Sequence, residues 1–133
     1  MKNFRSILSA FTLALIATSS IAFAQGKQAE TPMLKPDLLL GDVKNVSLFI
    51  DNVDIRGNEV DAFLDVKQTL AKAAEAAEKA GKKADDKITV EMKIETARNF
   101  LLLMSRAPLK GGEAEKFKAI ITAVTDAADK AQK

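Results

Sequence analysis

Apolar residues near the end of the chain recur at spacings of three and four, which is typical of one face of an amphipathic helix. They are Phe117, Ile120, Ile121, Val124, Ala127, Ala128 and Ala131. Glu113 and Glu115 lie at the start of this run and Lys130 and Lys133 at its end, so the charges match the helix dipole. The pattern predicts a helix that begins after the glycine pair at 111–112.

A second run with the same spacing lies between residues 58 and 81. Its apolar members are Val60, Phe63, Leu64, Leu70, Ala71, Ala74 and Ala77. Asn58 is a natural N-cap, and Gly81 is a natural stop because glycine readily takes up the left-handed conformation that ends many helices. Glu75 and Lys79 are spaced for an ion pair on the solvent side. The run predicts a second helix.

The stretch from residue 87 to residue 96 fits both a strand and a helix. Ile88, Val90, Met92 and Ile94 alternate with polar residues, as in a half-buried strand. A helical stripe is also present, formed by Val90, Ile94, Ala97, Leu101 and Met104. Strands usually run for about four to eight residues, whereas this apolar pattern continues through 100–104. We therefore favour a helix that Pro108 ends.

The segment 39–53 allows the same two interpretations. Its apolar residues step by four and three, as in a helix, and they are Leu39, Val43, Val46, Ile50 and Val53. Residues 46–50 alone resemble a short strand, and Gly41 weakens a helix. Four helices joined by short loops predict an all-α fold, a small up-down bundle formed by residues 37–133. The alternative is an α+β domain with a short two-stranded sheet that pairs 46–56 with 87–95.

The first 24 residues have the pattern of a secretory signal peptide. Lys2 and Arg5 precede an uncharged run that ends in Ala-Phe-Ala at 22–24. An uncleaved membrane anchor is the alternative, since the run approaches spanning length, but its serines and threonines favour cleavage. No cysteine follows the run, which excludes a lipid-modified lipoprotein. We expect a periplasmic or secreted chain that starts at Gln25, with a flexible lead-in over 25–36.

Composition narrows the possible functions. The formal net charge of +2 equals the charge of Lys2 and Arg5, so the rest of the chain is balanced, which argues against a nucleic-acid binder. The sequence has no cysteine, histidine, tryptophan or tyrosine. Without His and Cys, the chain lacks the commonest general base, the thiol nucleophile and the usual transition-metal ligands. We expect neither an enzyme nor a cofactor.

The acidic stretch 51–65 resembles a calcium loop in composition but not in spacing. A loop of the helix-loop-helix type needs glycine at position six, oxygen ligands at one, three and five, and a bidentate carboxylate at twelve. With Gly57 at six, Arg56 occupies position five and Phe63 occupies position twelve. The acids are therefore interpreted as turn and helix-entrance residues. A weak alternative is a hydrated divalent ion held by Asp54, Asp61 and Asp65.

The run FLLLM at 100–104 suggests a contact surface. Five consecutive apolar residues advance by about 400° around a helix, so they cannot all lie on one stripe. Leu102 and Leu103 point away from the stripe, toward the side where Ile88 and Met92 also fall in a continuous helix. Either the helix is buried on most sides, or these four residues form a partner-binding face.

These observations predict a class of function rather than a specific activity. We expect an exported, non-enzymatic helical protein that acts through protein–protein interaction in the bacterial envelope, as an adaptor, a small chaperone or an inhibitor. Its partner would be another envelope protein or a second copy of the chain, and neither nucleic acid nor membrane contact is expected after signal cleavage. The alternatives are a divalent-cation-binding protein that uses 51–65 and a carrier of an apolar ligand within the bundle.

Overall fold

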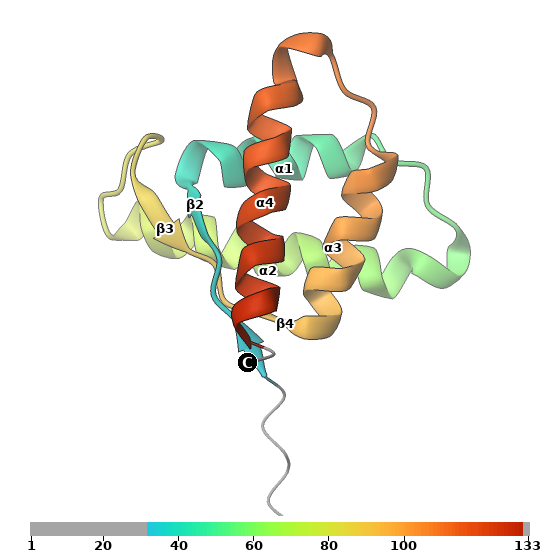
Figure 1. The fold of residues 1–133 in the computed structure, drawn as a ribbon, viewed down its shortest axis with the longest axis horizontal. Coiled ribbons are helices and arrows are strands. Elements are labelled where there is room, and N and C mark those ends of the chain that lie inside the picture. The colour runs from blue at the N-terminus through green and yellow to red at the C-terminus, as the bar shows by residue number, and fades with distance from the viewer. Residues whose placement is uncertain (1–31, 132–133) are drawn as a thin grey trace, which may run out of the picture.

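A computed structural model describes residues 32–131, which form four α-helices and a narrow β-ribbon (Figure 1). The elements in chain order are β1 (Met33–Leu34), β2 (Asp37–Leu39), α1 (Leu40–Asp51), α2 (Val60–Lys79), β3 (Lys87–Thr89), β4 (Met92–Lys93), α3 (Ile94–Arg106) and α4 (Ala114–Ala131). Short 3-10 turns, Gly57–Glu59 and Gly111–Glu113, lead into α2 and α4. The mostly helical fold with four helices is confirmed. The predicted signal peptide at 1–24 lies outside the described residues.

The helices form two layers that cross each other. In Figure 1, α1 and α2 run across the view, and α3 and α4 stand over them in the perpendicular direction. The long helix α2 packs against both α1 and α3, and α4 packs against α3 and the ribbon. Within residues 32–131, no helix is both long enough and apolar enough to cross a membrane.

The ribbon joins two distant parts of the chain. β2 pairs antiparallel with β3, and β1 pairs antiparallel with β4. The two halves belong to one bent ladder, because the backbone N–H of Val90 donates to the carbonyl oxygen of Pro36 between them at 3.0 Å. Proline has no N–H, so the ladder is interrupted at this residue. Alternate side chains point into the core, among them Leu34, Leu38 and Ile88.

The ribbon corrects three predictions. The helix predicted to run back to residue 88 begins only at Ile94, because 87–93 forms β3 and β4. The short two-stranded sheet of the alternative fold is present, but its second strand is 33–39, and 46–51 belongs to α1. The predicted flexible lead-in ended at residue 36, whereas Leu34 is already buried in β1. Alternation was the correct signal because one face of the ribbon covers the core and the other faces water.

Two glycines occupy positions where a residue with a Cβ would be strained or crowded. Gly81 has φ +77° and ends α2 as predicted, while the N–H of Lys82 donates to the carbonyl oxygen of Ala77 at 3.0 Å. Gly41 lies in the first turn of α1, and its N–H donates to the carbonyl oxygen of Ala84 at 2.8 Å. A Cβ at Gly41 would stand 3.2 Å from that oxygen, so the missing side chain allows the turn after α2 to approach α1.

The core lies between the two layers and the inner face of the ribbon. Its largest fully buried side chains include Phe100 and Met104 from α3, Ile50 from α1, Leu70 from α2 and Ile120 from α4. Every helix therefore contributes to a single apolar cluster. This packing stabilises the chain without disulfides, since the sequence has no cysteine.

Candidate partner-binding site

The C-terminal half of α1 and the connection between α3 and α4 border an open groove, called here the α1 groove. It has a volume of about 800 Å³ and is lined by Asn45, Leu48, Phe49, Asn52, Pro108, Leu109, Lys110, Gly112, Glu113 and Lys116. In Figure 1 the connection after α3 rises past the end of α1 before α4 begins. Pro108 sets this path, because the residue before a proline is driven out of the helical conformation, and Ala107 is extended.

Helical spacing places one stripe of α1 in the groove. Asn45, Leu48, Phe49 and Asn52 follow one another at intervals of three, one and three residues, so they share a face. This face differs from the buried stripe of α1, which includes Val43, Val46 and Ile50. The helix therefore has an apolar side toward the core and a second, mixed side toward the groove.

The groove exposes large apolar side chains to water. Leu48 is 62% exposed, and Leu109 on the opposite wall is 39% exposed. Phe49 is half-buried and packs against the core, so it connects the groove floor to the rigid interior. Single exposed leucines are common on protein surfaces, but leucines gathered in a concave site are typical of places where partners bind.

The rim of the groove is polar and carries positive charge. The Asn52 side-chain amide donates to the carbonyl oxygen of Leu48 at 2.8 Å, which fixes its orientation. Glu113 accepts the backbone N–H of Lys110 at 2.9 Å. Within residues 32–131, the ammonium groups of Lys110 and Lys116 form no ion pair. Two cations therefore flank the apolar floor and are available to an incoming carboxylate.

The contact face predicted from the sequence is not assembled in the structure. Ile88 lies on β3 and Met92 on β4, and both side chains are buried. On α3, Leu103 is buried at 3% exposure, whereas Leu102 is 54% exposed. The prediction assumed one continuous helix from 88 to 104, but β3 and β4 precede α3, which begins only at Ile94. Of the four residues, Leu102 alone remains accessible to a partner.

The three aspartates of the weak metal alternative do not converge. Asp54 and Asp61 are exposed, and Asp65 accepts a hydrogen bond from the Thr96 hydroxyl at 2.6 Å. Thr96 is the buried polar residue of the described core, so its hydrogen bond to Asp65 offsets the cost of burying the Thr96 hydroxyl. No group of three acidic side chains within 32–131 is placed to hold a metal ion.

Other acids of the stretch 51–65 make contacts that hold the start of α2. Glu59 accepts the backbone N–H of Arg56 at 2.8 Å, and its second oxygen lies 3.2 Å from the Arg106 guanidinium of α3. The hydrogen bond from Arg56, followed by that from Arg106, lowers the pKa of the Glu59 carboxyl below its ordinary value. Asp51 pairs with Lys67 between α1 and α2. These acids therefore act in capping and helix packing.

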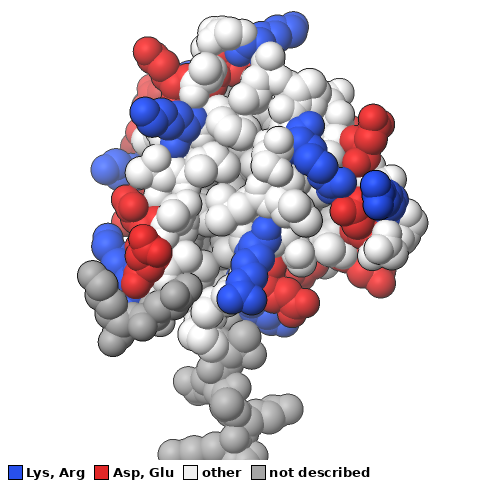
Figure 2. Space-filling model, turned by 45° about the vertical axis from the view of Figure 1, so that its right-hand side comes forward, with Lys and Arg blue, Asp and Glu red and all other residues white. Residues whose placement is uncertain are grey.

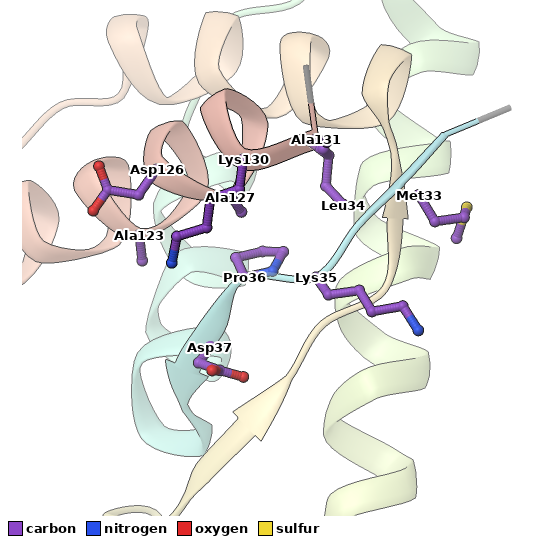
Figure 3. A pocket seen from close by; sticks show the side chains of 10 residues that line it. All are labelled: Met33, Leu34, Lys35, Pro36, Asp37, Ala123, Asp126, Ala127, Lys130 and Ala131. Atoms are coloured by element: carbon purple, nitrogen blue, oxygen red, sulfur yellow. The ribbon is translucent and has the colours of Figure 1, made fainter. Parts of the chain in front are cut away.

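A smaller groove lies between the ribbon and α4 (Figure 3). It has a volume of about 390 Å³, and the α4 side presents Ala123, Ala127 and Ala131, four residues apart. Figure 3 shows Ala123, Ala127 and Lys130 of α4 on one side of this groove and Pro36 of the ribbon on the other. The small alanine side chains leave room but offer little apolar area, so a partner would bury less apolar surface in this groove than in the α1 groove. Both grooves are open to solvent.

The face formed by α3 and α4 is mostly uncharged. Figure 2 shows Lys, Arg, Asp and Glu side chains around its margin and a central area without them. Leu101 on α3 and Phe117 and Ile121 on α4 are half-buried apolar residues packed against the core. Because these side chains already pack inward, the face has fewer protruding anchors than the α1 groove.

The sequence contained a signal for the α1 groove. Leu48 and Phe49 fall outside the stripe formed by Val43, Val46 and Ile50, just as Leu102 falls outside the buried stripe of α3. Leu48 is therefore recognisable in the sequence as an apolar residue outside the stripe of its helix. Leu109 carried no periodic signal, because it lies in a connection between helices.

Comparison with known proteins gives no relative from which a function could be transferred. No family model, no curated protein and no solved structure matches the chain significantly.

Proposed function

We propose that this chain is an exported, non-enzymatic protein that binds another protein of the bacterial envelope through the α1 groove. The observation that carries the proposal is Leu48, which is 62% exposed on a rigid helix within a concave site. The signal-peptide pattern of residues 1–24 supports a periplasmic or secreted location.

The lining of the groove favours a partner segment of particular chemistry. Covering the Leu48 side chain would contribute about 1.5–3 kcal/mol, which is enough to act as an anchor. Lys110 and Lys116 favour carboxylates beside that anchor, because an opposite charge steers association and fixes orientation. The Asn45 amide can donate to and accept from a peptide backbone. The preferred occupant is a segment with a large apolar side chain flanked by Asp or Glu.

A photo-crosslinking residue at position 48 tests the proposal in the native envelope. We expect it to form an adduct with one protein, while the same residue at Leu102, which is also exposed but lies outside the groove, does not. The crosslinked peptide of the partner should contain the apolar and acidic pattern. Identical adducts from both positions, or none from position 48, would contradict the proposed site.

Variants then measure the contribution of the groove to affinity. Leu48→Glu should weaken binding of the identified partner about 10- to 100-fold, because it replaces an apolar anchor by a charge. Leu102→Glu is the matched control and should leave affinity unchanged. Lys110→Glu combined with Lys116→Glu should lower the association rate and its dependence on salt. An affinity that Leu48→Glu leaves unchanged would exclude the groove.

A further inference from the structure

The outer edge of β3 and β4 has backbone groups without partners. In an antiparallel ladder, every second residue directs its N–H and C=O to the same neighbouring strand. The carbonyl of Asp86 and the N–H of Val90 bond to the β2 side, so Ile88 between them faces that side as well. Lys87, Thr89 and Glu91 therefore direct their backbone groups outward, where no backbone hydrogen bond within 32–131 reaches them.

The structure leaves space beside this edge. A groove of about 530 Å³ runs between α2 and the edge, lined on the strand side by Thr89, Glu91 and Lys93. On the α2 side it is lined by Ala73 and Ala76 among others. The same wall also includes Asp65, Thr69 and Lys72. An unpaired edge next to open space is a template for another strand.

The side chains along the edge carry a pattern of charge. Lys87, Thr89, Glu91 and Lys93 alternate with buried residues and all four are exposed. On the same face, Glu91 pairs with Lys35 at 2.8 Å, and the Thr89 hydroxyl donates to Asp37 at 2.7 Å. Lys87 and Glu91 have opposite charges and lie at equal distances on either side of Thr89.

We propose that two copies of this chain pair antiparallel through the β3–β4 edge, with Thr89 at the two-fold axis. In this register Lys87 of each copy stands opposite Glu91 of the other, and the outward backbone groups of 87, 89 and 91 exchange hydrogen bonds. The two ribbons become one four-stranded sheet. This interface is separate from the α1 groove, so it goes beyond the proposed function and does not depend on it.

Charge selects this register over its neighbours. A shift that centres the pair on Val90 places Lys87 opposite Lys93 of the second copy, and a shift to Glu91 places the two Glu91 carboxylates opposite each other. Like charges directly opposite each other are destabilising. Lysines on an edge strand discourage indiscriminate pairing, and here they favour the one alignment in which Lys87 meets an acid.

A single cysteine tests the position of the axis. The natural chain has no cysteine, so Thr89→Cys gives a protein that can form a disulfide only with a second copy. Hydrogen-bonded antiparallel partners have Cα atoms about 5.5 Å apart, which is within the range of a disulfide. Under mild oxidation we expect rapid covalent dimers from Thr89→Cys. Thr122→Cys, on the exposed side of α4, is the control. Equal crosslinking rates for the two variants would overturn the proposal.

Charge reversal tests the register without covalent chemistry. Sedimentation of the whole, unmutated protein should show a monomer–dimer equilibrium. Lys87→Glu alone and Glu91→Lys alone should each weaken the dimer about tenfold, because each creates two like-charge pairs. The double reversal should restore it, while Lys118→Glu on α4 should have no effect. A wild-type monomer at every soluble concentration, or a dimer insensitive to the single reversals, would overturn the proposal. Leu48→Glu should still dimerise.

Discussion

Leu102 and Leu103 are neighbours in sequence with opposite roles in the fold. Leu103 points into the core with Phe100 and Met104, whereas Leu102 lies on the outer side of α3. One step along a helix turns a side chain by about 100°, which is enough to move it from the core to water. At the scale of single residues, the side of α3 that a leucine occupies therefore decides how much it contributes to stability.

Replacing each of these leucines by glutamate should give very different results. Leu103→Glu places an unpaired charge in the core and should cost several kcal/mol, enough to unfold a domain of this size. Leu102→Glu should change the free energy of unfolding by less than about 0.5 kcal/mol. Urea denaturation followed by circular dichroism measures both. Similar losses for the two variants would mean that α3 is rotated from its described orientation.

Glu59 should give the stability of the protein a dependence on acid pH. Its pKa is lowered in the folded state by the Arg56 N–H and the Arg106 guanidinium, so the unfolded state binds the proton more readily. The contribution is present above the unfolded pKa of about 4.3 and is lost as pH falls through the folded value. Glu59→Gln should flatten this acid limb of the stability curve, with exposed Glu115→Gln as the control. If Glu59→Gln leaves the loss of stability at acid pH unchanged, the lowered pKa of Glu59 in the folded state is contradicted.

At the scale of elements, α2 ends just before Gly81, as the sequence predicts. The Gly81 backbone at φ +77° allows the chain to leave the helix and turn back toward α1, where Ala84 contacts Gly41. The left-handed conformation costs a residue with a Cβ about 1–2 kcal/mol. This turn therefore depends on one position that only glycine occupies without strain.

Gly81→Ala should destabilise the protein by about 1–2 kcal/mol, since alanine must adopt the same positive φ. Gly111→Ala is the matched control: Gly111 lacks a positive φ, and an added Cβ would meet no atom within 4 Å. Thermal unfolding of both variants checks the difference. If the two glycines are equally tolerant, the αL turn after α2 is not a constraint on the fold.

The sequence predicted the elements whose signals are local. The apolar faces of α2 and α4 and the end of α2 near Gly81 follow from spacing and turn residues within a single stretch, and both helices are present. The predicted N-cap Asn58 is wrong, because Asn58 lies inside the 3-10 turn Gly57–Glu59 that precedes α2. The strands at 87–93 were misassigned because Val90 and Ile94 fit a strand face and a helix stripe equally well. Their pairing partner, 33–39, is far away in sequence, so no local pattern could reveal it. The α1 groove likewise could not be predicted from a local pattern, because it forms where α1 lies beside the connection between α3 and α4, which is distant in sequence.

At the scale of the whole molecule, the four helices and the ribbon leave the α1 groove and the β3–β4 edge on different elements. A dimer formed at one would keep the other accessible. Two copies of the α1 groove in one assembly would then raise the effective affinity for a partner that presents two segments.

The mature protein should begin at Gln25. Signal peptidase cleaves after a small-residue pattern such as Ala-Phe-Ala, so the exported protein should lack residues 1–24. An intact mass measured on protein from the native envelope checks this directly. A mass that still includes residues 1–24 would indicate an uncleaved membrane anchor instead.

The ribbon makes the order of synthesis a constraint on folding. Asp37 and Thr89, which meet across it, stand 52 residues apart, and closing so long a loop is entropically unfavourable until other contacts support it. A chain that emerges N-terminus first presents Leu34 and Leu38 long before Ile88 and Met92 arrive to cover them. The ribbon therefore cannot close until about residue 93 has emerged, and until then Leu34 and Leu38 lack the strand that pairs with them.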